Sequence, residues 1–313
     1  MNGERKTTKK ANSALLCFSA ALIWGFGFVA QSEGMNHVGP YTFNFCRSVL
    51  ATIFLALVAL AFDRVQSGSE KASGFLPVAT VKQNWKDLLI GGICCGIFLT
   101  AGSILQTIGI IYTSVGKTGF LTALYIVLVP IFGLFLGKKC HFNVWISVAL
   151  ATIGLFLLCI TEDFHFFATD LYLLACAAMF ALHILVIDHF SPRVNGVWLS
   201  TIQFLFSSVV SCILMLILEK PSFSSIAAAG ITIVYAGIFS SAGGYTLQIL
   251  GQKGLNPSIA ALLLSLESVV SVLAGWLILH QVLTRRELIG CVLMFLAVVI
   301  VQIDFTNLKR KTA

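Results

Sequence analysis

Long apolar stretches recur along the whole chain and are separated by short connections that contain polar residues, Gly and Pro. Each stretch is continuously apolar instead of alternating, which indicates membrane-spanning helices and not the strands of a lipid-exposed barrel. A bilayer core of about 30 Å requires about 20 residues of helix. We therefore predict ten helical spans, at residues 13–31, 41–62, 88–109, 116–136, 142–160, 168–187, 197–218, 229–250, 258–279 and 287–304.

The composition excludes an ordinary soluble protein. Hydrophobic residues make up 58% of the 313 residues, charged residues only 11%, and the mean hydropathy is +0.95. A typical soluble domain is about one quarter charged. The nine cysteines lie almost all inside apolar stretches, without metal-ligand spacing, so neither a disulfide framework nor a metal site is expected.

The positive charges are distributed so that they predict an orientation. The net charge is +7, but the basic residues form short clusters between apolar stretches, which favours membrane topology over nucleic-acid binding. With the N-terminus inside, 15 of the 20 Lys and Arg residues fall in inside connections and four outside, while Arg47 lies within a span. This bias predicts a multi-pass protein of the cytoplasmic membrane with both termini in the cytoplasm. The outside pair Arg285-Arg286 opposes the rule.

Two segments of the chain repeat each other. "GIFLTAGSILQTIG" (96–109) aligns with "GIFSSAGGYTLQILG" (237–251) after a one-residue gap, and each lies in the third span of its half. The halves are then 13–160 and 168–304, with five spans each. Because five is odd, the second half must cross the membrane in the opposite direction to the first. Inverted repeats of this kind are typical of transporters that alternate between two openings.

The motifs in these spans resemble those of the EamA-type members of the drug/metabolite transporter superfamily. The matching stretches are "ALIWGFGFVA" (21–30), "NFCRSVLA" (44–51), "YTSVGKTGFLTALYIVLVP" (112–130) and "SLESVVSVLAGWLILHQVLTRRELIG" (265–290). The resemblance implies ten helices around a central cavity, and export or exchange of amino acids or small metabolites. The chain departs from the family pattern at Ser268, where Pro usually follows the Glu, and at Gln281, where an acidic residue commonly ends that helix.

Two charged residues fall at membrane depth. Glu267 is nine residues into its predicted span, roughly 14 Å from the boundary, too deep for its side chain to reach water. We expect it to line the cavity, the alternative being a protonated carboxyl that joins two helices. Arg47 is only seven residues from Pro40, so it can either line the cavity or extend outward to the interface. Charged groups at such depth usually face a bundle interior or a wet cavity.

Five further side chains are candidates for the cavity wall, each with a purely structural alternative. One is a midspan histidine, which can equally be a satisfied core residue. Two are amides at matched places, which also suit helix-to-helix hydrogen bonds, and two are aromatic residues, which also suit packing. They are His183, Gln106, Gln248, Tyr125 and Trp24.

Catalytic chemistry is not visible in the sequence. "SVGKT" (114–118) resembles the end of a phosphate-binding loop, but the required leading Gly falls at Ile111 and no strand precedes it. We expect no enzyme activity, no catalytic residue, no metal and no cofactor. The predicted protein is an all-α membrane carrier that moves a small solute through the bilayer, with proton coupling left open by Glu267. A lipid or lipid-linked sugar translocase and an intramembrane enzyme are the alternatives.

Overall fold

The computed structural model describes residues 2–67, 84–138, 140–160, 167–279 and 284–302, and over these residues it contains helices and no strand. Gln281, one of the departures from the family pattern, lies outside them. The helices of the first half are α1 Asn2–Gly34, α2 Pro40–Ser67, α3 Trp85–Ile111, α4 Val115–Ala123, α5 Tyr125–Phe135 and α6 Phe142–Cys159. Those of the second half are α7 Asp170–Phe190, α8 Gly196–Leu218, α9 Phe223–Ala228, α10 Gly230–Val234, η1 Tyr235–Gly244, α11 Tyr245–Gln252, α12 Pro257–Leu264, α13 Glu267–Leu279 and α14 Arg285–Gln302.

Eight helical segments of the described chain are long and apolar enough to cross a membrane. They correspond to the first eight expected spans, and they make the chain a multi-pass membrane protein by length and composition. The ninth expected span is represented by the shorter apolar segment Pro257–Leu273. The tenth corresponds to α14, which begins with the three charged residues 285–287. The count of ten therefore stays a prediction.

Three of the expected spans are interrupted near their middles. The span expected at 116–136 is divided into α4 and α5 at Leu124, and the span at 258–279 is divided into α12 and α13 at residues 265–266. Pro130 follows the first break within α5, where its missing N–H leaves one more backbone carbonyl without a helical partner. Backbone interruptions at membrane depth are tolerated only where protein or a wet cavity covers them. The breaks therefore point to the interior of the bundle.

The third interruption explains the one-residue gap between the repeated segments. The segment 96–109 lies in the regular helix α3, whereas 237–244 lies in η1, a stretch of π-helix. A π-helical turn holds one residue more than an α-helical turn, because its hydrogen bonds span five residues. The extra residue of the second segment is accommodated there, so that Gln248 continues in regular helix α11. Such π segments occur frequently at functional sites.

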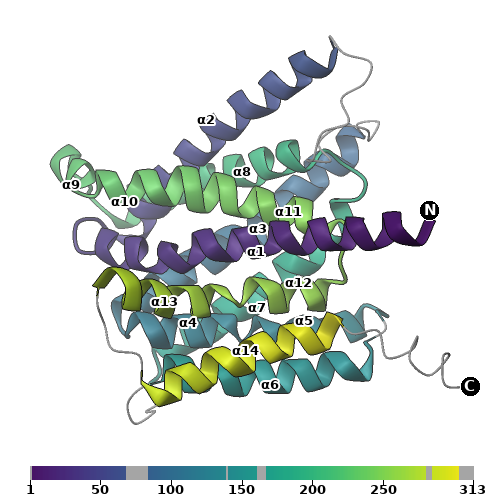
Figure 1. Ribbon diagram of the computed structural model, residues 1–313. Helices are drawn as coiled ribbons and strands as arrows, with labels where there is room; N and C mark the ends of the chain where they lie inside the picture. The colour runs from purple at the N-terminus through teal and green to yellow at the C-terminus, as the bar shows by residue number, and fades with distance from the viewer. Residues whose placement is uncertain (1, 68–83, 139, 161–166, 280–283, 303–313) are drawn as a thin grey trace, which may run out of the picture.

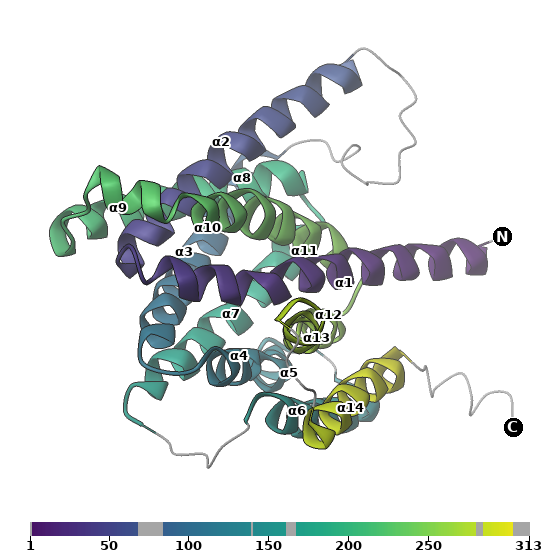
Figure 2. The same ribbon diagram turned by 60° about the vertical axis from the view of Figure 1, so that its left-hand side comes forward.

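The helices pack around α1, which runs through the middle of the molecule. In both views α1 lies between α2 and α8 on one side and α6 and α14 on the other (Figures 1 and 2). α2 packs mainly against α8, and α6 mainly against α14. The α6–α14 approach is close because Gly154 and Gly290 face each other: a Cβ on either would lie about 3 Å or less from the carbonyl oxygen of the other. Small residues allow such contacts between membrane helices.

Ion pairs connect α7 to the span formed by α4 and α5, one pair at each end of that span. α1 begins and α14 ends at the same face of the bundle, here called the terminal face (Figure 1). At this face Lys138, after α5, pairs with Asp188 of α7. At the opposite face Lys117 of α4 lies 2.6 Å from Asp170. Asp170 is almost completely buried, whereas Asp188 is partly exposed.

The difference in burial predicts unequal costs of breaking the two pairs. Asp170→Asn keeps the shape of the side chain but leaves the largely buried Lys117 without its countercharge, so the free energy of unfolding should fall by ~3 kcal/mol. Asp188→Asn, the matched control, should cost under ~1 kcal/mol because water screens that pair. Thermal unfolding of both variants in one detergent measures the difference. Equal losses would contradict the prediction.

Candidate functional site

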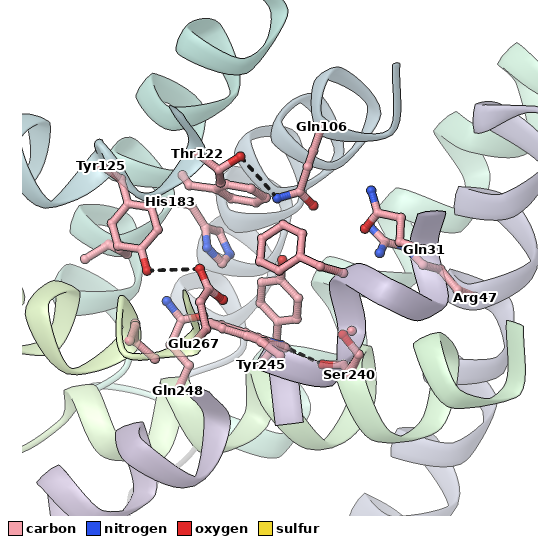
Figure 3. A pocket seen from close by; sticks show the side chains of 16 residues that line it. Gln31, Arg47, Gln106, Thr122, Tyr125, His183, Ser240, Tyr245, Gln248 and Glu267 are labelled. Carbon is pink, nitrogen blue, oxygen red and sulfur yellow. Dashed lines mark hydrogen bonds between the residues drawn. The ribbon is translucent and has the colours of Figure 1, made fainter. Parts of the chain in front are cut away.

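A cavity of about 60 Å³ lies among α1, α2, α3, α4, α5, α7, η1, α11, α12 and α13. Charged and polar side chains from both halves of the chain reach it. All seven residues that the sequence analysis selected lie along its wall: Trp24, Arg47, Gln106, Tyr125, His183, Gln248 and Glu267. Figure 3, in which all of these except Trp24 are labelled, shows the labelled side chains converging from several helices. The geometry brings them together, while their part in binding stays a prediction.

Glu267 and Tyr125 meet where the two interrupted spans break. Glu267 is the first residue of α13 and Tyr125 the first residue of α5. The Tyr125 hydroxyl donates a long hydrogen bond of 3.5 Å to Oε1 of Glu267. Glu267 is only 5% exposed, and the structure thus places a carboxyl group inside the bundle with one weak donor from the described part of the chain. The carboxyl retains capacity to accept further hydrogen bonds.

Arg47 lies at the other end of the same cavity. It is 6% exposed and its Nε is buried with no hydrogen-bond partner among the residues that the structure describes, so the side chain turns inward instead of extending to the interface. Its guanidinium carbon lies 5.9 Å from the centre of the Phe43 ring. Figure 3 shows Arg47 beside Gln31 and far across the cavity from Glu267, with Tyr245 between them. Within the described chain, Arg47 and Glu267 form no ion pair with each other.

The two matched glutamines contribute amide groups to the wall in different ways. Gln106 of α3 donates to the Thr122 hydroxyl at 3.5 Å, a long contact that does not hold it tightly. Gln248 of α11 is 2% exposed, and its Oε1 has no hydrogen-bond partner within the described chain. A buried carbonyl oxygen without a donor is costly. Both amides therefore offer hydrogen-bonding capacity to a molecule in the cavity.

His183 combines the two roles that the sequence analysis separated. Its Nε2 lies 3.0 Å from Oε1 of Gln203 on α8, so the ring is fixed by a core partner. The same ring lines the cavity and packs edge-on against Tyr245, with ring centres 5.8 Å apart. Only the side of the ring away from Gln203 is left for a solute.

Trp24 ties α1 to the π-helical segment. Its indole Nε1 donates to the carbonyl oxygen of Ser240 at 3.0 Å, and its ring lies 4.7 Å from that of Tyr245. This contact requires Gly244, because a Cβ there would overlap the indole nitrogen. The extra residue of the second repeated segment thus builds part of the wall.

Four polar wall residues escaped the sequence analysis: Gln31, Thr122, Ser240 and Tyr245. Both Ser240 and Tyr245 belong to the segment 237–251, and Tyr245 lies at the point where its alignment with 96–109 requires a gap. That gap was the available signal. Gln31 and Thr122 are isolated polar residues near apolar neighbours, and nothing in the sequence separates them from packing residues.

Comparison with known proteins gives consistent results over nearly the whole chain. The EamA-like transporter family matches residues 11–160 and again 167–303. An uncharacterized transporter of Archaeoglobus fulgidus is 28% identical over 290 residues, which cover 90% of this chain and 83% of that protein. A crystal structure of another protein, 17% identical, superposes with a TM-score of 0.75 over 93% of this chain and 96% of its own, which indicates a shared fold. The chain belongs to the EamA-like transporter family.

Proposed function

We propose that this membrane transporter is a carrier for a small organic solute of the amino acid or metabolite class, which it exports or exchanges by alternating access. The observation that carries the proposal is the placement of Arg47 and Glu267 in one cavity, buried and not paired with each other. Charged groups at membrane depth are costly and usually mark a substrate path. A solute with an anionic group toward Arg47 and a cationic group toward Glu267 would offset both costs.

The size of the cavity supports a protein that changes shape. A water molecule needs about 15 Å³ of such volume, so 60 Å³ accommodates about four waters and no metabolite. Binding of an organic solute therefore requires the surrounding helices to move apart. Alternating access supplies that movement.

Reciprocal contacts between α2 and α8 support the proposed inverted repeat. The Glu219 carboxylate, at the end of α8, accepts hydrogen bonds from the backbone N–H and hydroxyl of Thr42, at the start of α2. Asp63, near the end of α2, accepts from the indole of Trp198, at the start of α8. The same number of residues separates Thr42 from Asp63 and Trp198 from Glu219. The end of each helix therefore supplies a carboxylate to the start of the other, at equivalent places, as expected for two halves related by a half-turn.

Two more pairs fit the same relation. Tyr125 and Glu267, which contact each other, lie equally far along their spans from the helix caps Ser114 and Asn256. The glycines at the α6–α14 crossing also face each other. An axis through these pairs, in the membrane plane, would place the first half (13–160) and the second (168–304) in opposite orientations. The two halves could then exchange conformations to open the cavity to either side.

Removal of the carboxylate tests the proposal directly. Glu267→Gln keeps the side-chain shape, so folding and membrane insertion should persist, while transport should fall about tenfold or more, or lose its pH dependence. A charge-assisted contact is worth ~1.5–3 kcal/mol, which corresponds to this range. Uptake of radiolabelled amino acids into proteoliposomes, over a series of pH values, is the measurement.

Tyr125→Phe is the matched control, because it removes the weak donor and keeps the charge of Glu267. It should retain most of the transport. If Glu267→Gln transports as the wild type does at every pH, the carboxyl is a structural hydrogen-bonding group and the proposal is wrong.

We further propose that the terminal face is cytoplasmic, on the ground of the Lys and Arg distribution. The two ends of α8 test this orientation, since Arg193 precedes it and Ser224 follows it, and both are exposed. In intact cells an impermeant thiol reagent should label Ser224→Cys and spare Arg193→Cys. The reverse pattern would place the termini outside.

A further inference from the structure

A second cavity, of about 200 Å³, lies at the face opposite the terminal face, between the start of α4, the end of α6, α13 and the start of α14. Under the proposed orientation it is on the outer side, and we call it the outer cavity. Its polar wall consists of Ser114, Cys159, Ser268, Ser271 and Glu287. Phe28, which is 6% exposed, lines both this cavity and the central one. Phe28 is therefore the residue that the two linings share.

The break between α12 and α13 sends consecutive side chains into different cavities. Glu267 lines the central cavity, and Ser268 lines the outer one. Ser268 is 3% exposed, and its Oγ has no well-formed hydrogen bond within the described chain. A buried hydroxyl in this state can bind a polar group that enters the outer cavity.

The outer cavity has an acidic wall. Glu287 lines it, and its two hydrogen bonds from Thr284 both use Oε2, which leaves Oε1 outside that contact. Two nearby cations are directed elsewhere: Lys117 pairs with Asp170, and Arg286 lies over the Phe156 ring at 5.3 Å. Arg285, the first residue of α14, is exposed. None of the three lines the cavity.

The dipoles of the helices that begin or end at the outer cavity do not reverse its negative potential. α4 and α14 begin at the cavity with the positive ends of their dipoles, and α6 ends there with the negative end. Each end is equivalent to about half a charge, so the three together leave about half a positive charge, which is smaller than the full negative charge of Glu287. The full charge of Glu287 therefore decides the local potential, which favours a cationic group.

The terminal face carries a collapsed counterpart of the outer cavity. Asn256, Pro257 and Ser258, at the start of α12, line a space of about 10 Å³ together with residues 129 and 130. The outer cavity uses the corresponding start of α4 (114–116) and the corresponding turn of α13 (271 and 272). Under the proposed inverted repeat the two spaces are equivalent, and only the outer one is open.

We propose that the outer cavity is a second binding site, which holds the cationic group of the solute on the outer side of Phe28 before or after its passage through the central cavity. The ligand class is an organic ammonium group, bound by Glu287 with the hydroxyls of Ser268 and Ser271. This inference rests on the proposed transport function and adds a second binding site and a barrier to the transport path. Phe28 is a positioning and gating residue, which must turn aside for the solute to pass.

Charge-selective labelling tests the site. Ser271→Cys places a thiol in the wall, and purified protein in detergent is treated with a trimethylammonium-bearing or a sulfonate-bearing thiosulfonate of similar size. Ser224→Cys, exposed on α9, gives the intrinsic rate ratio of the two reagents. Peptide mass spectrometry separates these thiols from the native cysteines. The ratio of cationic to anionic labelling should be about tenfold higher at position 271 than at position 224.

Glu287→Gln provides the charge control, because its amide oxygen can still accept from Thr284. In this background the ratio at position 271 should fall to within about twofold of the ratio at position 224. An unchanged ratio, or a thiol at position 271 that neither reagent reaches, would overturn the proposed site.

The barrier is tested with a thiol in the central cavity. Thr122→Cys should react with the cationic reagent about tenfold faster when combined with Phe28→Ala. Ile184→Ala is the matched control, because Ile184 lines the central cavity but not the outer one. Equal acceleration by both variants would show that Phe28 is not the barrier.

The labelling experiments and the transport experiment fail independently. Labelling in detergent reports the charge of the outer cavity and its accessibility to the reagents, and it does not require that the protein transports a solute. A protein whose transport depends on Glu267, but whose outer cavity shows no charge selectivity, would contradict only the second site.

Discussion

The structure depends on one constraint, which is that the bilayer offers no hydrogen bonds to a polypeptide backbone. Long helices satisfy this constraint internally, and they account for most of the described chain. Three places depart from regular helix: the breaks at Leu124 and at residues 265–266, and the π-helical stretch 235–244. All three adjoin the central cavity. The cavity and the irregular backbone are thus one feature, since protein side chains and a polar interior replace the lipid there.

The two halves, whose backbones are proposed to be symmetric, differ in the chemistry of their side chains. Tyr125 and Glu267 occupy equivalent places, yet only one is a carboxylic acid. Arg47 corresponds in the same way to Gln203, which fixes His183. Each half therefore supplies one charge of the pair, at opposite ends of the cavity. In the proposed mechanism, a symmetric scaffold would permit two conformations of similar energy, while the asymmetric charges would give a dipolar solute one orientation.

The sequence analysis and the structure differ most at residues whose conformation depends on tertiary contacts and not on the local hydrophobic pattern. Continuous hydrophobicity predicted uninterrupted spans at 116–136 and 258–279, because hydropathy does not distinguish a helix from two shorter helices in line. Lys117 counted only as an outside charge in the topology, whereas it pairs with the buried Asp170. For Arg47 the sequence allowed two directions, and the burial of its guanidinium against Phe43 selected the inward one. Each outcome depended on a neighbour distant in the chain.

By itself, the sequence determined that this is a helical membrane protein, where most helices lie, and which few side chains are too polar for the lipid, because these properties follow from transfer of each segment out of water. The one-residue gap lies at the π-helical segment, but the sequence analysis predicted an ordinary helix there. Only the tertiary structure decided that Arg47 and Glu267 share a cavity without pairing, and that Glu267 and Ser268 face different cavities. Those facts depend on how the helices rotate and cross, which packing between distant segments controls.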